Sequence, residues 1–449
     1  GVCCTSQWSG TVAVDATGEP LMNAVIWMDT RGAPHVRAIS RGLVNIEGYG
    51  ASKLMHWLQS TGGAPGHSGK DSLAHILYLK QERPEIYQAT YKFLEPLDYL
   101  NLKLTGLFAA STCSITLHWV TDNRDIHHID YDAGLLHMAG LDRAQLPDLK
   151  LPTDVLGPLT PAAAQALGLP AGLPVVMGAP DVHTAAIGSG AVKDFSAHLY
   201  VGTSSWLIGH VPFKKCNIVQ NMASLPSAIP GRYLLMNEQE VAGDALSFLR
   251  DNILYPDDAL RTELPPADLF MRLDQLAASV EAGSGKLIFT PWLYGERTPV
   301  ENASLRGGFH NMSLRTTRAH MVRAVLEGVA FNSRWLLDAV EKFMGTSLPA
   351  INFIGGGAKS PLWCQIFADI LQRPIRQMQS PLHANARGTA MLASVGLGLG
   401  NFDDLAEHIE VSHVYTPNAE NRAIYDSLYN EFLQIYRCNK KIYGRLNAQ

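Results

Sequence analysis

Residues 351–360 read Ile-Asn-Phe-Ile-Gly-Gly-Gly-Ala-Lys-Ser, a strand-like run that ends directly in three glycines. Glycine lets the backbone turn sharply and approach a ligand closely, and a helix that begins after such a turn favours anions or nucleotides at its amino end. The G-x-x-x-x-G-K-[ST] spacing of a Walker A loop is absent, and a tight structural turn is the alternative. The stretch therefore predicts an α/β fold with a candidate ligand site in this turn.

Strand-like and helical segments alternate through the rest of the chain. Apolar patterning predicts strands over residues 11–15, 24–27, 173–177, 197–201, 206–211 and 287–289. It predicts helices over residues 53–58, 72–79, 97–104, 162–167, 317–343 and 421–443. A strand, turn and strand near residue 11 recurs near residue 201. We therefore expect two α/β halves of similar build, with a seam near residues 194–197.

Composition excludes several classes of protein. Of 449 residues, 47% are apolar and 17% are charged, which excludes wholesale disorder. Thirty-six basic against 41 acidic residues give a net charge of −5, which argues against a nucleic-acid binder. No apolar run approaches the roughly 20 residues of a membrane span. The six cysteines form no C-x-x-C pair, which favours free thiols and a cytoplasmic location.

An acidic residue follows the strand predicted at 173–177, in the sequence Met177-Gly-Ala-Pro-Asp181-Val-His183. Open α/β sheets place their ligands at the carboxyl edge of the strands, where this carboxylate would lie. Beside a bound alcohol, Asp181 could accept the hydroxyl proton as a base. The alternative is that Asp181 caps the helix that follows it.

Three further segments are candidates for ligand contacts. The turn Gly202-Thr203-Ser204 could hold phosphate oxygens with its amides and hydroxyls, or could be a plain β-turn. The segments 7–10 (Gln-Trp-Ser-Gly) and 27–31 (Trp-Met-Asp-Thr-Arg) place polar groups beside an indole, which suits a sugar. Capping, with a surface ion pair between Asp29 and Arg31, is the alternative there.

Other polar residues carry less information. His127, His128 and His183 lack partners at metal-binding spacing and are expected at the surface or beside the site. Arg323 and Glu327 are four residues apart on a predicted helix, which favours a structural ion pair.

Together these segments resemble the FGGY family of carbohydrate kinases, nearest its xylulokinase-like branch. The most specific match is residues 289–299, Phe-Thr-Pro-Trp-Leu-Tyr-Gly-Glu-Arg-Thr-Pro. It is followed by Arg-Gly-Gly-Phe at 306–309 and by residues 318–331, which resemble the family's second signature. The glycine turn at 355–357 resembles its adenosine motif. The motifs follow the family's order along essentially the whole chain.

The resemblance implies the actin-like ATPase fold, a duplication of two ribonuclease-H-like domains around a central cleft. Residues 1–195 would form the sugar-binding domain and residues 196–449 the ATP-binding domain. Asp181 would be the catalytic base, and Mg²⁺ would bridge the phosphates of ATP. The implied sugar contacts are Gln7, Trp8, Ser9, Asp29, His67 and Val182. The implied ATP contacts are Gly202, Thr203, Ser204, Gly356, Gly357, Ala358 and Lys359.

The sequence departs from the family's pattern in three places. The Asp-x-Gly-Thr phosphate hairpin that usually precedes the sugar segment is absent, so we expect a first domain that is incomplete at its start and assign no metal ligand. Ser9 and Val182 stand where the family usually has His and Asn. Residues 44–67 form a longer loop than usual, which makes His67 a candidate sugar contact.

The leading hypothesis is therefore an ATP-dependent kinase of a sugar or polyol, with a ketopentose such as xylulose as substrate. The alternative is a protein with the kinase fold that binds sugar or nucleotide with little or no catalysis, because the first phosphate motif is missing. A third is another actin-like ATPase, such as a chaperone. The expected partners are small molecules, without nucleic acid or membrane, and family members are often homodimers.

Overall fold

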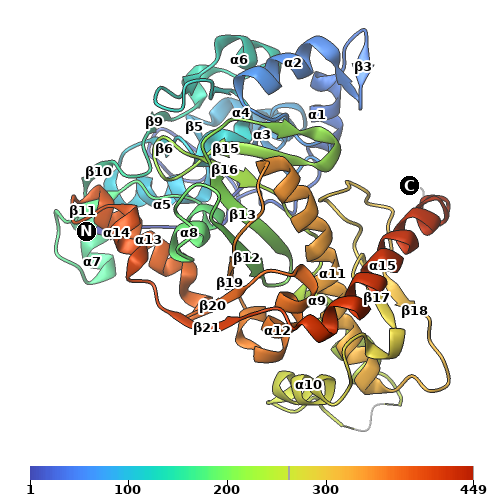
Figure 1. Ribbon diagram of the computed structural model, residues 1–449. Helices are drawn as coiled ribbons and strands as arrows, with labels where there is room; N and C mark the ends of the chain where they lie inside the picture. Colours follow the sequence, from blue (N-terminus) through green and yellow to red (C-terminus); the bar gives the residue numbers. More distant parts are fainter. Residues whose placement is uncertain (261–262, 448–449) are drawn as a thin grey trace.

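The computed structural model describes residues 1–260 and 263–447 of the chain. It is an α/β protein, and the two halves of the chain build separate sheets (Figure 1). Over the described residues the larger sheet has eight strands and lies in the C-terminal half, whereas the largest sheet of the N-terminal half has three. Both halves thus have the α/β build that the sequence pattern predicts, with sheets of different extent.

The eight-stranded sheet has the strand order β14-β15-β16-β13-β12-β19-β20-β21. Its strands are β12 (Ala197–Val201), β13 (Ser205–Val211), β14 (Cys216–Asn217), β15 (Met222–Pro226), β16 (Tyr233–Met236), β19 (Ile351–Ile354), β20 (Ile375–Met378) and β21 (Val411–Tyr415). The parallel pairs are β12 with β19 and β19 with β20. The strands predicted at 197–201 and 206–211 are therefore neighbours, joined by the turn at 202–204.

The three-stranded sheet has the order β1-β11-β10, with β1 (Val2–Cys3) parallel to β11 (Pro174–Val176) and β10 (Val155–Pro158) antiparallel. The remaining strands form pairs: β2 (Val12–Val14) with β5 (Lys92–Leu94), β3 (Asn45–Ile46) with β4 (Tyr49–Gly50), β6 (Ala109–Ser111) with β9 (Asp148–Lys150), β7 (Thr121–Asp122) with β8 (Asp130–Tyr131), and β17 (Ile288–Thr290) with β18 (Gly308–His310). The strand predicted at 24–27 is reduced to one bridge between Thr11 and Val25, because Ile26 and Trp27 are exposed and pair with no strand.

Each predicted helix is present. They are α2, α3, α5, α7, α11 and α15, and the structure adds further helices that the apolar pattern does not predict. The helices of the N-terminal half are α1 (Ala33–Ser40), α2 (Ala51–Ser60), α3 (Ser72–Glu82), α4 (Pro84–Ala89), α5 (Pro96–Thr105), α6 (Ala133–Ala139), α7 (Pro161–Leu167) and α8 (Asp181–Gly188). Those of the C-terminal half are α9 (Gly243–Leu249), α10 (Leu269–Ala278), α11 (Arg318–Met344), α12 (Pro361–Leu371), α13 (Ala384–Gly396), α14 (Phe402–Glu407) and α15 (Ala419–Leu446). No helix of the described residues combines the length and apolar character needed to cross a membrane.

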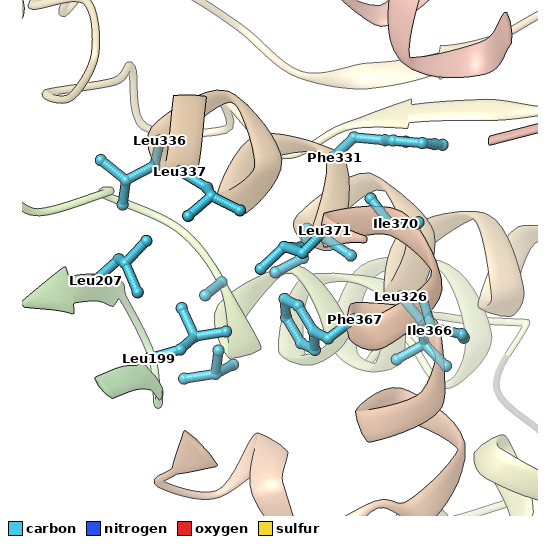
Figure 2. Packing of buried hydrophobic residues seen from close by; sticks show 14 of the residues in the cluster. Leu199, Leu207, Leu326, Phe331, Leu336, Leu337, Ile366, Phe367, Ile370 and Leu371 are labelled. Carbon is cyan, nitrogen blue, oxygen red and sulfur yellow. The ribbon is translucent and has the colours of Figure 1, made fainter. Parts of the chain in front are cut away.

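The core of the C-terminal half lies between the large sheet and helices α11 and α12. Figure 2 shows Leu199 and Leu207 of the sheet facing side chains of these helices, among them Leu337 and Phe367. All four side chains are buried. Removing an aliphatic side chain of this size from water stabilises a fold by about 1.5–3 kcal/mol. This packing therefore fixes the strands whose ends carry the candidate phosphate and adenosine turns.

Helices α8 and α13 cross at two glycines and join the halves of the chain (Figure 1). A Cβ atom on Gly188 would lie 1.8 Å from the carbonyl oxygen of Ala384, and one on Gly388 would lie 1.9 Å from that of Thr184. The backbones touch, so only hydrogen fits at either position. The helix that begins with Asp181 is thereby held against the C-terminal half.

Candidate functional site

Four of the sequence-predicted segments lie at the carboxyl ends of parallel strands. The segment 7–10 follows β1 and the segment 177–183 follows β11, and these two strands are neighbours. The turn 202–204 follows β12 and the glycine turn follows β19, which are also neighbours. Parallel sheets place ligands at this edge. The topology therefore pairs the candidate sugar segments in one half and the candidate ATP segments in the other.

Asp181 is the first residue of α8, and no side chain caps that helix. The capping interpretation is therefore wrong. The carboxylate instead accepts a hydrogen bond from the amide of Val182 at 2.9 Å. Burial raises the pKa of Asp181 to about 6; the amides of Val182 and Trp8 oppose this shift, and the carboxylate of Glu238 adds to it. An acid with this pKa is ionised at neutral pH and is more basic than an exposed aspartate, which suits a general base.

Glu238 belongs to a set of four charged side chains that spans the two halves. We call Lys70, Glu238, Glu240 and Arg297 the junction cluster. The guanidinium of Arg297 donates from Nε to Glu240 Oε1 at 2.6 Å and from Nη1 to Glu238. Lys70 Nζ lies 3.8 Å from Glu240 Oε1. Because Lys70 comes from the N-terminal half and Glu240 from the C-terminal half, this ion pair crosses between the halves.

The segment around Glu296 holds the junction cluster in place. The buried Glu296 carboxylate accepts the amide hydrogens of Arg297 at 2.8 Å and Glu240 at 3.1 Å. Its other oxygen accepts from Asn332 of α11 at 2.6 Å. Burial raises the pKa of Glu296 to about 7. The Gly-Glu-Arg-Thr-Pro sequence thus carries one buried carboxyl group, Glu296, that orients the Arg297 guanidinium toward the junction.

The segment 7–10 is held rigidly by bonds to neighbouring elements. Gln7 is half-buried, whereas Trp8 and Ser9 are buried. The Trp8 indole donates to the carbonyl of Ser114 at 2.9 Å, and the Ser9 hydroxyl donates to the carbonyl of Lys70 at 2.6 Å. Since both groups are occupied within the protein, a ligand here would meet the Trp8 ring and backbone rather than its N–H.

The remaining sugar candidates, Asp29, His67 and Val182, each contact other parts of the protein. Asp29 receives two hydrogen bonds from Arg31 Nε, at 2.9 and 3.1 Å, so the ion-pair alternative is confirmed. His67 stacks on Tyr49 with ring centroids 3.9 Å apart, and burial lowers the pKa of His67. Val182 packs on the apolar cluster beneath Trp8. A sugar contact by any of these residues stays a prediction.

The histidines and the helix ion pair are placed as follows. His128 is an exposed partner of Asp125, as expected. His183 is buried, which excludes a surface location for this residue. Its ring and the Trp8 ring pack in an edge-to-face arrangement, with their centroids 5.1 Å apart. Arg323 Nε donates to Glu327 at 2.8 Å within the core, which confirms the structural interpretation of that pair.

The two candidate ATP turns are open in part. Thr203, Gly356 and Lys359 are exposed, whereas Gly357 and Ala358 are buried. A Cβ on Gly357 would lie 2.8 Å from Val201 Cγ1, so packing requires this glycine; a Cβ on Gly356 would meet only the carbonyl of Val201, at 4.0 Å. A nucleotide at this turn would therefore rest against Gly356 and Lys359.

Ser204 links the phosphate turn to the junction, because its hydroxyl hydrogen-bonds with Glu238 and partly opposes the rise in that carboxyl's pKa caused by burial. No three His, Cys, Asp or Glu side chains gather as a metal site in residues 1–260 or 263–447.

Sequence reasoning missed the roles of five residues at the junction. Lys70 and Asp71 follow His67, and Asp71 Oδ2 accepts from the amide of Gly66 at 2.6 Å and from the Trp119 indole at 2.8 Å. Glu238 and Glu240 follow β16. Arg297 belongs to the motif at residues 289–299, but the sequence pattern predicts no contact for its side chain. The run Gly69-Lys70-Asp71 and the close spacing of the two glutamates were the available signals.

Known proteins match nearly the whole chain. Residues 1–188 match the FGGY family of carbohydrate kinases, N-terminal domain, and residues 197–397 match its C-terminal domain. The first match begins at residue 1, so the expectation of an incomplete first domain is not confirmed. The xylulose kinase of Staphylococcus epidermidis is 30% identical over 98% of this chain and 83% of its own length.

Two solved structures have the same fold. The ligand-bound xylulose kinase from Lactobacillus acidophilus has a TM-score of 0.84, and the gluconate kinase from the same organism has 0.83. Each is 25% identical and covers 98% of this chain and 85% of its own. The fold is therefore the duplicated actin-like ATPase fold. The chain belongs to the FGGY family of carbohydrate kinases, phosphotransferases that act on an alcohol group of a sugar.

Proposed function

We propose that this kinase transfers the terminal phosphoryl group of Mg·ATP to a hydroxyl of a ketopentose such as xylulose. The observation that carries the proposal is the position of Asp181 at the junction of the halves, with its pKa raised to about 6. The Asp181 carboxylate takes the hydroxyl proton, the sugar oxygen bonds to the γ-phosphorus, and the bond from that phosphorus to ADP breaks.

Each half of the chain would bind one of the two substrates. Residues 1–195 would bind the sugar through the segment 7–10, and residues 196–449 would bind ATP at the turns 202–204 and 356–359. The magnesium ion supplies charge neutralisation on the phosphates when bound. The exposed surfaces of Thr203, Gly356 and Lys359 support this assignment. A cytoplasmic location and a homodimer remain predictions from the sequence.

Release of ADP from Mg·ATP, measured across ketopentoses, pentitols, glycerol and hexoses against a sugar-free blank, tests the proposal. We expect D-xylulose to stimulate release above the blank and to give the highest kcat/KM in the panel. If another sugar but not D-xylulose stimulates ADP release, that sugar replaces D-xylulose as the proposed substrate. Sugar binding without any ADP release would favour the alternative, a kinase fold that binds its ligands without catalysis. ATP hydrolysis at a rate that no sugar changes would favour the third alternative, another actin-like ATPase.

A further inference from the structure

Lys70 occupies a defined place between the two halves of the molecule. Its peptide carbonyl accepts the hydroxyl of Ser9, so the residue is fixed against the candidate sugar segment. Its ammonium lies 5.9 Å from the centroid of the Trp27 ring and 3.8 Å from Glu240 Oε1. The two charged side chains are only 19% and 15% exposed. A half-buried cation is therefore held beside the candidate sugar segments 7–10 and 27–31, with its counter-ion supplied by the other half.

The charges of the junction cluster cancel. Arg297 and Lys70 are the two cations, and Glu238 and Glu240 are the two anions that contact them. Glu240 contacts both cations, through Arg297 Nε at 2.6 Å and the more distant Lys70. Removing its charge would leave Lys70 without a counter-ion at this distance. A half-buried charge without a partner is costly, so such a cation would recruit an anion.

We propose that the Lys70–Glu240 pair sets the charge selectivity of the acceptor site, admitting a neutral ketose or polyol and rejecting a sugar acid. Polarised N–H donors and carboxylate acceptors without net charge match the hydroxyls of a neutral sugar. The carboxylate of a sugar acid would instead bring an extra negative charge to a cluster whose cations are already paired, and it would be repelled by the Asp181 carboxylate in a partly desolvated place. Relatives of this chain include kinases of both kinds, so the distinction has chemical meaning here.

This inference deepens the proposed function and rests on the acceptor site lying at the junction. Its test is equilibrium binding of D-xylulose and D-gluconate by calorimetry to the full chain without ATP, so it does not depend on turnover. In the wild type we expect xylulose to bind more tightly than gluconate. In Glu240→Gln we expect the ratio of gluconate to xylulose affinity to rise about tenfold or more.

A double variant and a matched control identify the cation responsible. Lys70→Met combined with Glu240→Gln should return the ratio to the wild-type value, because the unbalanced ammonium is gone. Glu431→Gln removes a carboxylate from the exposed face of α15, far along the chain from the junction cluster, and should leave the ratio unchanged. If the ratio of gluconate to xylulose affinity stays raised in the double variant, Lys70 is not the cation responsible and the inference is wrong.

Two further results would also overturn the inference: a wild type that binds gluconate more tightly than xylulose, or a Glu240→Gln variant with an unmoved ratio. Either result leaves the kinase itself intact if sugars still stimulate ADP release. Absence of ADP release with normal, charge-selective sugar binding would instead reject the proposed function and support the selectivity. The two failures are therefore distinguishable.

Discussion

The Asp181 carboxyl group acts as a base only when it is ionised, and burial places that ionisation at a pKa of about 6. Since the protonated acid cannot accept a proton, kcat/KM for the sugar should fall about tenfold per pH unit below about pH 6 and level off above about pH 7. Measuring sugar-dependent ADP release from about pH 5 to 8 determines this acidic part of the pH profile of kcat/KM. A profile that stays flat down to pH 5 would remove Asp181 from the role.

The sequence predicts single residues well where the backbone alone fixes their place. Asp181 and the segment 7–10 each follow a strand, and parallel strands bring their carboxyl ends to one edge. The Lys70–Glu240 pair could not be predicted in this way. Its members are 170 residues apart and belong to different halves, so their contact depends on how the halves pack.

At the scale of helices, the crossing of α8 and α13 depends on glycine. The Cβ of a Gly188→Ala variant would lie 1.8 Å from the Ala384 carbonyl oxygen, so the helices must separate. We expect a loss of about 2–4 kcal/mol in the free energy of unfolding, measured by urea titration. Gly444→Ala in α15 is the control, because nothing lies within 4 Å of its Cβ and alanine favours a helix. Equal stability of the two variants would show that the crossing is not tightly packed.

The glycine turn after β19 allows a second paired test. Gly356 is exposed, with helical dihedral angles, so Gly356→Val should keep the fold's stability while weakening ATP binding about tenfold or more by filling the candidate nucleotide surface. Gly357→Val should lower stability instead, because its Cβ meets Val201 and Trp363. Calorimetric ATP titration and thermal unfolding separate the two effects. Unchanged ATP affinity in a stable Gly356→Val protein would make this turn purely structural.

Elements with strong local signals were predictable, and those made by tertiary pairing were not. Helix α5 has Pro96 in its first turn and Gly106 in a left-handed conformation at its end, and the sequence predicts it nearly completely. Strand β19 has three apolar residues in four, Ile351, Phe353 and Ile354, directly before the glycine turn, and is predicted residue for residue. The edge strands β14 and β21 carry no such pattern, because β14 has only two residues, both half-buried, and β21 is largely exposed, so both gain their conformation from the neighbouring strand.

For the whole molecule, buried acids make stability depend on pH. Burial raises the pKa of Asp98 to about 8, against a usual value of 3.8. Between about pH 6.5 and 8 the folded protein holds a proton there that the unfolded chain has released, so stability falls as pH rises. Buried histidines such as His118, whose pKa burial lowers to about 3, contribute with the opposite sign near pH 6.5, because the unfolded chain binds a proton there that the folded protein does not, so only a comparison of variant with wild type isolates Asp98.

The expected slope from Asp98 is about 1.4 kcal/mol of unfolding free energy per pH unit. Asp98→Asn, which mimics the neutral acid and can still accept from Ser114, should lose correspondingly less stability between about pH 6.5 and 7.5. Urea unfolding at both pH values measures the difference. An identical loss in variant and wild type would contradict a neutral Asp98 in the folded state.

The central claim is that a sugar hydroxyl is phosphorylated by ATP at the junction, with Asp181 as the base. The most direct measurement is xylulose-stimulated ADP release by the wild type and by Asp181→Asn, alongside ATP affinity of both proteins. We predict stimulated release in the wild type, a loss of about 10²–10⁴ in kcat for the variant, and ATP affinity that is nearly unchanged. A variant that turns over xylulose at the wild-type rate would contradict the claim.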